Sequence, residues 1–470
     1  MHINRVPVIL FVAIMLSSCG RGTMNEKKDQ NTSTMFTPIE GKIHLMNLDP
    51  GHFHAGLVQK IMYDAVDPVL HVYAPKGPEL EDYLTRIRLY NSRPENPTAW
   101  KLRVYTGSDY FEKMITGKPG NVMIVSGNNS RKTEYILGAV KAGIHVLADK
   151  PMVIDPAEFP LIEEAFSLAE KKGILLYDIM TERYEATTKA QKLLSMDRDI
   201  FGTLLKGSVD QPAITKESVH HFSKIVSGKP LIRPAWFFDT RQQGEGLVDV
   251  TTHLVDLVQW EAFPEVTLDK SDVEILSARR WTTDLTMSMF EKVTGLKEYP
   301  DFLQRYLEED LLKVYSNGEI NYSLKGVHAK VSVIWNFEAP GGTGDTHHSI
   351  MRGSKVSLVI RQGKNEGFKP TLYLELNNGT DPETYKRNLQ KKFHQCMDPV
   401  FPGIELRVHD EGSWIIDIPD RFKMGHEAHF GQVTEKYLDF LASGNLPEWE
   451  IPNMIVKYYT TTGGLLKARE

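Results

Sequence analysis

Short apolar runs alternate with longer amphipathic segments through the first half of the chain. The apolar runs are rich in β-branched residues and predict buried strands at 42–48, 69–73, 103–105, 121–125, 144–148 and 174–177. The amphipathic segments predict helices at 57–65, 79–89, 108–115, 131–142 and 157–172. This alternation predicts an α/β fold in which residues 41–181 form a doubly wound parallel sheet.

The pattern changes after about Glu182. A helix is predicted at 185–194 and a strand at 202–209, followed by a long irregular segment and a helical pattern between 244 and 260. Later runs at 329–337 and 355–361 alternate as in a sheet with one solvated face, and helices at 434–441 and 451–467 close the chain. We therefore expect a second domain over residues 182–470.

The N-terminus is typical of an export signal. Arg5 precedes the apolar stretch Val8–Leu16, which is too short to span a bilayer. The following Leu-Ser-Ser-Cys-Gly resembles a bacterial lipoprotein box, which implies a signal peptide over 1–18, a lipid on Cys19 and a membrane-anchored protein outside the cytoplasm. Residues 19–40 are polar and predict a flexible tether. The alternative is a simple secretory signal with an incidental cysteine.

Composition narrows the functional classes. The chain has 470 residues and a net charge of −6, without the basic balance expected of a nucleic-acid-binding protein. Its two cysteines, Cys19 and Cys396, predict no internal disulfide framework. No metal site is predicted.

A glycine-bearing turn follows the first predicted strand. If Gly51 is the second glycine of a G-x-G-x-x-G motif, Asp49 takes the first position and His54 the third. We predict that Gly51, His52, Phe53 and His54 contact a dinucleotide, although the motif is degenerate.

Two later strand ends complete the predicted cofactor set. The second strand lacks the usual ribose-binding acid, and Lys76 beyond it either favours a 2′-phosphate or is simply solvated. The fourth strand ends in Ser126, Asn128 and Asn129, which suit ribose or phosphate but are also common turn formers. NAD and NADP therefore both remain open.

Two motifs are candidates for catalysis. Lys150 follows a buried strand, at the edge where α/β sheets bind ligands, although an ordinary surface turn would have the same sequence. Asp249 and His253 are four residues apart and predicted to share one helix face, so that the carboxylate holds the imidazole as a general base. The alternative is a helix N-terminal acid beside a core histidine.

Both motifs resemble one oxidoreductase family. Ala142-Gly143-Ile144-His145-Val146 with Ala148-Asp149-Lys150-Pro151 is similar to the Ala-Gly-Lys-His-Val and Glu-Lys-Pro segments of the glucose-fructose oxidoreductase, inositol dehydrogenase and rhizopine-catabolism (Gfo/Idh/MocA) family. Residues 244–256 resemble its Gly-Gly-Gly, Asp-x-x-x-His and Asp pattern. The resemblance implies a Rossmann domain, followed by an α+β domain with a large open, mainly antiparallel sheet that commonly mediates homo-oligomers.

The resemblance also implies roles for individual residues. Lys150 would bind the reacting hydroxyl of a sugar or cyclitol, His253 would take its proton, and Asp249 would orient His253. Asp149 replaces the family's usual glutamate and could reach the cofactor ribose. Tyr184 and Trp236 are expected on the substrate side.

Export restricts the expected function further. Nicotinamide cofactors are not expected free outside the cytoplasm, so NAD or NADP should be tightly bound. We expect an oxidoreductase that forms keto-sugars from a sugar or glycoside. The alternatives are a lipid-anchored carbohydrate-binding protein without redox turnover, and a glycosidase that works by oxidation and elimination.

Overall fold

The computed structural model describes residues 34–36, 38–39, 41–226, 229–341 and 343–470. The predicted signal peptide, residues 1–18, and Cys19 lie outside these ranges. Within them, no helix combines the length and apolar character that crossing a membrane requires. Thr34–Met35 (β1) pairs with Asn445–Leu446 (β20), and Phe36 is buried. The range predicted for the tether, residues 19–40, therefore extends too far, because it includes residues 34–36, which contact the folded part of the chain.

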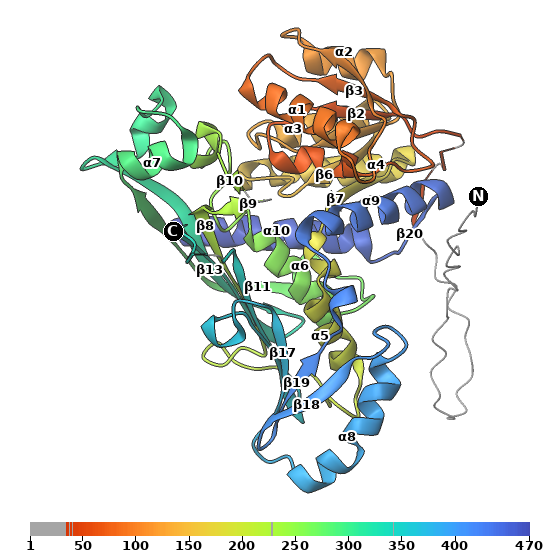
Figure 1. Cartoon of the computed structure of the whole chain (residues 1–470), viewed down its shortest axis with the longest axis vertical. Coiled ribbons are helices and arrows are strands. Elements are labelled where there is room, and N and C mark those ends of the chain that lie inside the picture. Colours follow the sequence, from red (N-terminus) through yellow and green to blue (C-terminus); the bar gives the residue numbers. More distant parts are fainter. Residues whose placement is uncertain (1–33, 37, 40, 227–228, 342) are drawn as a thin grey trace. The chain divides into compact units, whose positions relative to one another are not determined.

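A six-stranded parallel sheet occupies the first part of the chain (Figure 1). Its order is β4-β3-β2-β5-β6-β7, the doubly wound arrangement, with the switch of direction between β2 and β5. The prediction of a Rossmann-like α/β fold is thus confirmed. The strands are β2 (Leu45–Leu48), β3 (Val69–Tyr73), β4 (Lys101–Tyr105), β5 (Val122–Val125), β6 (His145–Asp149) and β7 (Leu176–Ile179). The helices are α1 (Pro78–Ser92), α2 (Tyr110–Gly117), α3 (Lys132–Lys141) and α4 (Phe159–Lys172).

One expected helix of this region is absent. In place of a helix at 57–65, the chain forms two short 3-10 turns, η1 (Phe53–Gly56) and η2 (Val58–Lys60). Side chains from outside the turns take the carbonyl groups that would continue a helix. Trp100 Nε1 donates to Gln59 O at 2.8 Å, and Arg93 Nη2 donates to Lys60 O at 2.6 Å.

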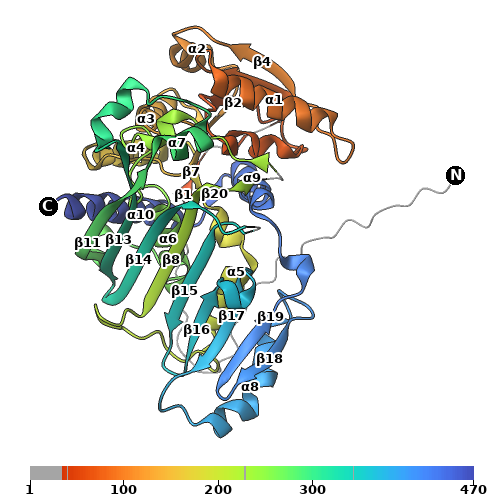
Figure 2. The same ribbon diagram turned by 60° about the vertical axis from the view of Figure 1, so that its left-hand side comes forward.

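A ten-stranded, mainly antiparallel sheet forms the second part (Figure 2). Its order is β11-β13-β14-β8-β15-β16-β17-β19-β18, with β12 beside β13, and only β14 and β8 pair in parallel. The strands are β8 (Ile214–Ser223), β11 (Val273–Leu285), β12 (Leu307–Glu308), β13 (Leu311–Leu324), β14 (Val327–Glu338), β15 (Thr346–Arg352), β16 (Val356–Arg361), β17 (Thr371–Leu376), β18 (Glu405–Asp410) and β19 (Ser413–Asp417).

Residues 202–209, predicted as a strand, make only isolated bridges, at Leu204 and Gly207. The strand of this region is β8, within the segment expected to be irregular, and a short pair, β9 (Ile225–Val226) and β10 (Lys229–Pro230), follows it. Apolar residues of five helices pack on the sheet, and α9 completes the described helices of this part. The helices are α5 (Ala186–Met196), α6 (Thr251–Ala262), α7 (Met287–Thr294), α8 (Pro382–Met397), α9 (His426–Ser443) and α10 (Glu450–Arg469).

The last two helices return to the parallel sheet. Phe430 and Tyr437 of α9 and Tyr458 of α10 belong to the same apolar core as β2, β5 and β6. A buried ion network joins the parts, since Asp256 of α6 binds Arg183 at 2.7 Å and Lys457 at 3.0 Å. Asp256 is thus held in this network, and its charge also acts on His253, three residues earlier in the same helix.

Candidate functional site

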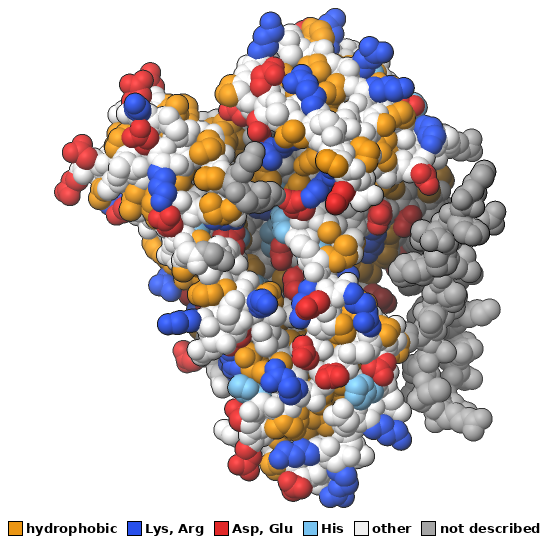
Figure 3. Space-filling view, viewed as in Figure 1, with side chains coloured by type: hydrophobic (Ala, Val, Ile, Leu, Met, Phe, Trp, Pro, Cys, Tyr) orange, Lys and Arg blue, Asp and Glu red, His pale blue; other side chains and the backbone are white. Residues whose placement is uncertain are grey.

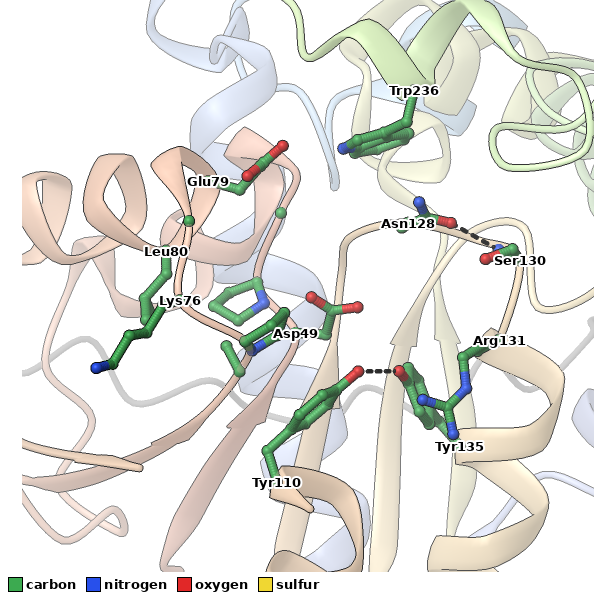
Figure 4. Close-up of a pocket in the computed structure, with 15 residues that line it drawn as sticks. Asp49, Lys76, Glu79, Leu80, Tyr110, Asn128, Ser130, Arg131, Tyr135 and Trp236 are labelled. Atoms are coloured by element: carbon green, nitrogen blue, oxygen red, sulfur yellow. Dashed lines mark hydrogen bonds between the residues drawn. The ribbon is translucent and has the colours of Figure 1, made fainter. Parts of the chain in front are cut away.

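A cavity of about 260 Å³ lies at the switch point of the parallel sheet, between the loops that follow β2, β3 and β5 (Figure 4). Such switch points are where doubly wound sheets bind nucleotides. Gly127 allows two of these loops to meet, since a Cβ at this position would lie 2.0 Å from Asp49 O. The lining residues include Asp49, Gly51, Lys76, Glu79, Tyr110, Asn128, Arg131, Tyr135 and Trp236.

Asp49 keeps the backbone of the glycine it replaces. Its φ is +46°, a left-handed conformation that aspartate tolerates better than most residues. Burial raises the pKa of its carboxyl to about 6, with the charge of Glu79 acting in the same direction. At pH 7 a carboxyl group with this pKa is still mostly ionised, so Asp49 keeps most of its negative charge beside the cavity.

The backbone N–H groups of the same loop are already used. Gly51 N donates to Asp49 O at 2.8 Å, His52 N to Ser126 O at 3.3 Å, and His54 N to His52 Nδ1 at 3.3 Å. In the usual fold such groups and a helix N-terminus receive the pyrophosphate. Here the helix is replaced by η1, so the loop lacks that part of the cradle.

Three predicted contact residues have other surroundings than expected. The amide groups of Asn128 and Asn129 donate to Gln242 Oε1 at 2.7 Å and Gln243 O at 2.8 Å, which ties the β5 loop to the segment before α6. Trp236, expected on the substrate side, instead lines the switch-point cavity, 3.7 Å from where a Cβ of Gly51 would lie.

Lys150 and Asp249 form an ion pair across the two parts of the chain. Lys150 Nζ lies 2.5 Å from Asp249 Oδ1, and the side chains are 11% and 8% exposed. Asp249 Oδ2 accepts a hydrogen bond from Gln243 Nε2 at 3.0 Å. Because α6 begins only at residue 251, Asp249 lies in the preceding turn. The prediction that it holds the imidazole of His253 is therefore wrong, and Gln243 is a partner that the sequence pattern did not indicate.

His253 has a free ring nitrogen close to this pair. Its Nδ1 is buried and has no hydrogen-bond partner among the described residues. Burial, followed by the nearby charges of Lys150 and His426, holds the pKa of His253 well below its ordinary value. The ring is therefore neutral at pH 7 and able to accept a proton from a group that enters the site.

A histidine cluster lies beside the carboxyl end of β6. Asp149 Oδ2 contacts His54 Nδ1 at 3.0 Å and accepts from Ser126 Oγ at 2.8 Å. His426, at the start of α9, has its ring centre 5.4 Å from that of His54. Sequence analysis missed His426, although His-x-x-His at 426–429 was a visible signal. Histidine and acidic side chains are also visible in the central hollow of Figure 3.

Further acidic and basic groups lie near Lys150. Asp345 contacts His220 Nδ1 at 2.9 Å and pairs with Lys224. Burial raises the pKa of Glu182 to about 7, with smaller effects from the charges of other groups, including Lys150 and Asp345.

Tyr184, predicted on the substrate side, lies elsewhere. Its ring lies under Lys189 Nζ at 4.8 Å, and the charges that affect its hydroxyl include acidic residues of α9. Among the described residues, its ring contact is thus with α5 and not with Lys150 or His253. Tyr184 is therefore not grouped with Lys150, Asp249 and His253.

Comparison with known proteins identifies the family. Residues 190–469 match the family described as "Putative oxidoreductase C terminal domain". A crystal structure described as a putative oxidoreductase from Parabacteroides merdae is 54% identical, with a TM-score of 0.90, and the match covers 93% of this chain and 99% of that one. No curated protein matches the chain.

More distant structures share the fold. An oxidoreductase domain protein from Kribbella flavida is 16% identical, with a TM-score of 0.58, over 92% of this chain and 98% of that one. A levoglucosan dehydrogenase in complex with NADH and levoglucosan is 13% identical, with a TM-score of 0.57, over 91% and 97% of the two chains. At these identities the likeness shows the fold alone.

Proposed function

Because the chain belongs to this oxidoreductase C-terminal domain family, we propose that it moves hydride between a bound nicotinamide dinucleotide and the carbon of a sugar or glycoside hydroxyl, which yields a keto-sugar. The observation that carries the proposal is the convergence of Lys150, Asp249 and His253. A paired cation and a neutral, unpartnered imidazole lie together at the carboxyl edge of the parallel sheet.

The chemistry follows from the acidity of the substrate. A sugar hydroxyl is a weak acid near neutral pH, so its oxidation needs a base and a nearby positive charge. Lys150 donates a hydrogen bond to the hydroxyl oxygen, and His253 accepts the hydroxyl proton. Asp249 fixes the Lys150 ammonium and acts on the base only through it. The levoglucosan dehydrogenase of the same fold, solved with a sugar-derived ligand, supports the substrate class.

The residues present suit a dinucleotide in the switch-point cavity. Asp49 has a left-handed backbone at the position of the first glycine, and Gly127 brings the β2 and β5 loops together. When bound, a nicotinamide dinucleotide supplies the hydride acceptor or donor. Lys76 is exposed on the wall of the cavity, near the position where an acidic residue would favour NAD. Titration with NAD and NADP decides between the two dinucleotides.

Export and assembly are further parts of the proposal. The Leu-Ser-Ser-Cys-Gly sequence supports lipidation of Cys19 and attachment to a bacterial membrane outside the cytoplasm. A protein there needs its dinucleotide tightly bound. The resemblance to the Gfo/Idh/MocA family supports homo-oligomers built through the large sheet, and light scattering of the purified protein tests this.

The decisive experiment measures cofactor and turnover together. Protein purified without denaturants is analysed by native mass spectrometry, and a panel of sugars and glycosides is then added while the absorbance of reduced nicotinamide is followed. A bound dinucleotide and a sugar-dependent absorbance change support the proposal. Sugar binding without an absorbance change would instead assign the chain to carbohydrate binding, and no dinucleotide before or after its addition would refute the oxidoreductase.

Glu182 favours a second candidate, glycoside cleavage by oxidation, elimination and re-reduction. A ketone acidifies the C–H bond of the neighbouring carbon, and a carboxyl group with a pKa of about 7 near Lys150 is suited to remove that proton. Glycoside cleavage without net dinucleotide turnover, lost in Glu182→Gln, would establish this function. Stable accumulation of the keto-sugar, without release of the aglycone, would exclude it.

A further inference from the structure

Two side chains of the loop after β2 and one at the end of β6 form a group with the composition of a metal site. Nδ1 of His52, Nδ1 of His54 and a carboxylate oxygen of Asp149 are donor atoms of a set whose members lie within 4.8 Å of one another. The side chains are 18%, 10% and 6% exposed, respectively. Within the described ranges, this is the one group of three or more His, Cys, Asp or Glu side chains arranged in this way.

The local fold explains why the donors face one another. His52 is the cap of η1 and His54 lies inside it, so that the tight turn places both rings on the side of β6. Their ring centres are 4.2 Å apart, and Asp149 ends β6 directly opposite.

The contacts within the group show what a cation would replace. His54 Nδ1 lies 3.0 Å from Asp149 Oδ2, and His52 Nδ1 accepts a hydrogen bond from the backbone N–H of His54 at 3.3 Å. A metal ion bound by these atoms would take the place of both contacts, because metal binding needs deprotonated ligand atoms.

A second layer of contacts fixes the carboxylate. Ser126 Oγ donates to Asp149 Oδ2 at 2.8 Å, and Lys132 Nζ donates to the backbone carbonyl of Asp149 at 3.0 Å. Hydrogen bonds of this kind orient the ligands of known metal sites. Lys150 and Lys132 both act on His52 as positive charges, so a bound cation has to be held against them.

We propose that His52, His54 and Asp149 bind one divalent transition-metal ion. Two imidazoles and one carboxylate suit Zn²⁺, Co²⁺, Fe²⁺ or Mn²⁺, and three protein ligands leave coordination positions open. His52 and His54 belong to the loop after β2, in which the N–H groups of residues 51 and 52 are already bonded to backbone oxygens. Resting on the proposed function, the ion would supply the positive charge for the dinucleotide phosphates that the missing helix N-terminus does not.

The test measures metal binding directly. Full-length protein is treated with a chelator, dialysed against Zn²⁺ and analysed for metal content, and the Co²⁺ form is examined by visible absorption. We expect one ion per chain and a ligand-field spectrum of a nitrogen and oxygen site. His52→Ala and Asp149→Asn should lower the affinity by about 10- to 100-fold or more. Circular dichroism and melting curves verify that both variants are folded.

The control is a histidine that forms a similar pair at the surface. His394 Nδ1 lies 3.0 Å from Asp398 Oδ1, the same distance as in the His54–Asp149 pair, but no third donor completes a group there. His394→Ala should bind Zn²⁺ like the wild type. No stoichiometric binding by the wild type, or equal binding in folded His52→Ala and Asp149→Asn, would overturn the proposal and leave the His54–Asp149 hydrogen bond as the whole role of these residues.

Dinucleotide affinity is measured separately, by fluorescence titration of the metal-free and Zn²⁺-loaded protein. We expect the metal to tighten binding by about tenfold or more, as a charge-assisted contact does. Metal binding without this effect would overturn the phosphate role. No dinucleotide binding in either form would refute the proposed function, whereas the metal stoichiometry would still decide the metal site.

Discussion

Replacement of Asp249 by asparagine tests the role that the structure assigns to this carboxylate. Its Oδ1 lies 2.5 Å from Lys150 Nζ, whereas His253 Nδ1 has no hydrogen-bond partner in the part of the chain that the structure describes. Asp249→Asn keeps the shape of the side chain and removes its charge. We therefore expect the variant to weaken the hold on the Lys150 ammonium and to leave His253 unchanged.

The magnitude follows from the burial of the pair. Lys150 and Asp249 are 11% and 8% exposed, so solvent screens their interaction little. A hydrogen bond between charged groups contributes about 1.5–3 kcal/mol. At pH 7 the loss in kcat/KM should be about 10- to 100-fold.

The assay is the pH profile of kcat/KM with the sugar that reacts fastest. The acid limb, which reports the base, should stay in place, because Asp249 does not contact His253. Gln243→Ala is the matched control, since it removes the 3.0 Å bond to Asp249 Oδ2 but keeps the carboxylate charge. A shifted acid limb together with an unchanged kcat/KM at its plateau would refute this reasoning and restore the Asp249–His253 pair predicted from the sequence.

Three further predictions concern stability, each measured by urea unfolding. Lys216 and Glu261 form a fully buried ion pair at 2.6 Å, so Glu261→Gln should lower the free energy of unfolding by about 3–5 kcal/mol. The double variant Lys216→Met with Glu261→Leu should lower it little, because no unpaired charge is left buried. Equal losses in the two variants would contradict this prediction. Burial lowers the pKa of His145 to about 4, so between pH 6.5 and 4 the unfolded chain binds a proton that the folded chain does not. The free energy of unfolding should therefore fall as the pH falls through this window. His145→Asn should make this dependence on pH less steep. Gly127→Ala should lose about 1–3 kcal/mol because its Cβ meets a backbone oxygen at 2.0 Å, while Gly117→Ala, with open space around it, should not.

Elements determined by local pattern could be predicted from the sequence. The strand predicted at 69–73 coincides with β3, and the helix predicted at 157–172 differs from α4 by two residues at its start. Gly143 and Gly173 both have positive φ at helix ends, as their position after amphipathic runs indicates. Short periodic segments bounded by glycine contain the information that these elements need.

Elements that depend on distant partners could not be predicted. The segment after Gly51 has an amphipathic pattern, but Arg93 and Trp100, about 40 residues further on, bind its carbonyl groups and stop a helix. Asp249 has helical spacing to His253, yet its partner Lys150 lies 99 residues earlier. His426 reaches the site from the last part of the chain, which no local pattern relates to His54.

The departures from the family pattern at His54 and Asp149 are best understood as one change. In the sequence the two changes look independent. His54 stands in place of a glycine in the loop after β2, and Asp149 stands in place of a glutamate at the end of β6. In the structure the two side chains meet at 3.0 Å, and Ser126 completes the contacts of the carboxylate. A histidine in place of a glycine extends toward β6, and the shorter acid leaves room for its ring. Around this contact, paired side chains therefore stand where the dinucleotide-binding pattern has a glycine and a longer acid.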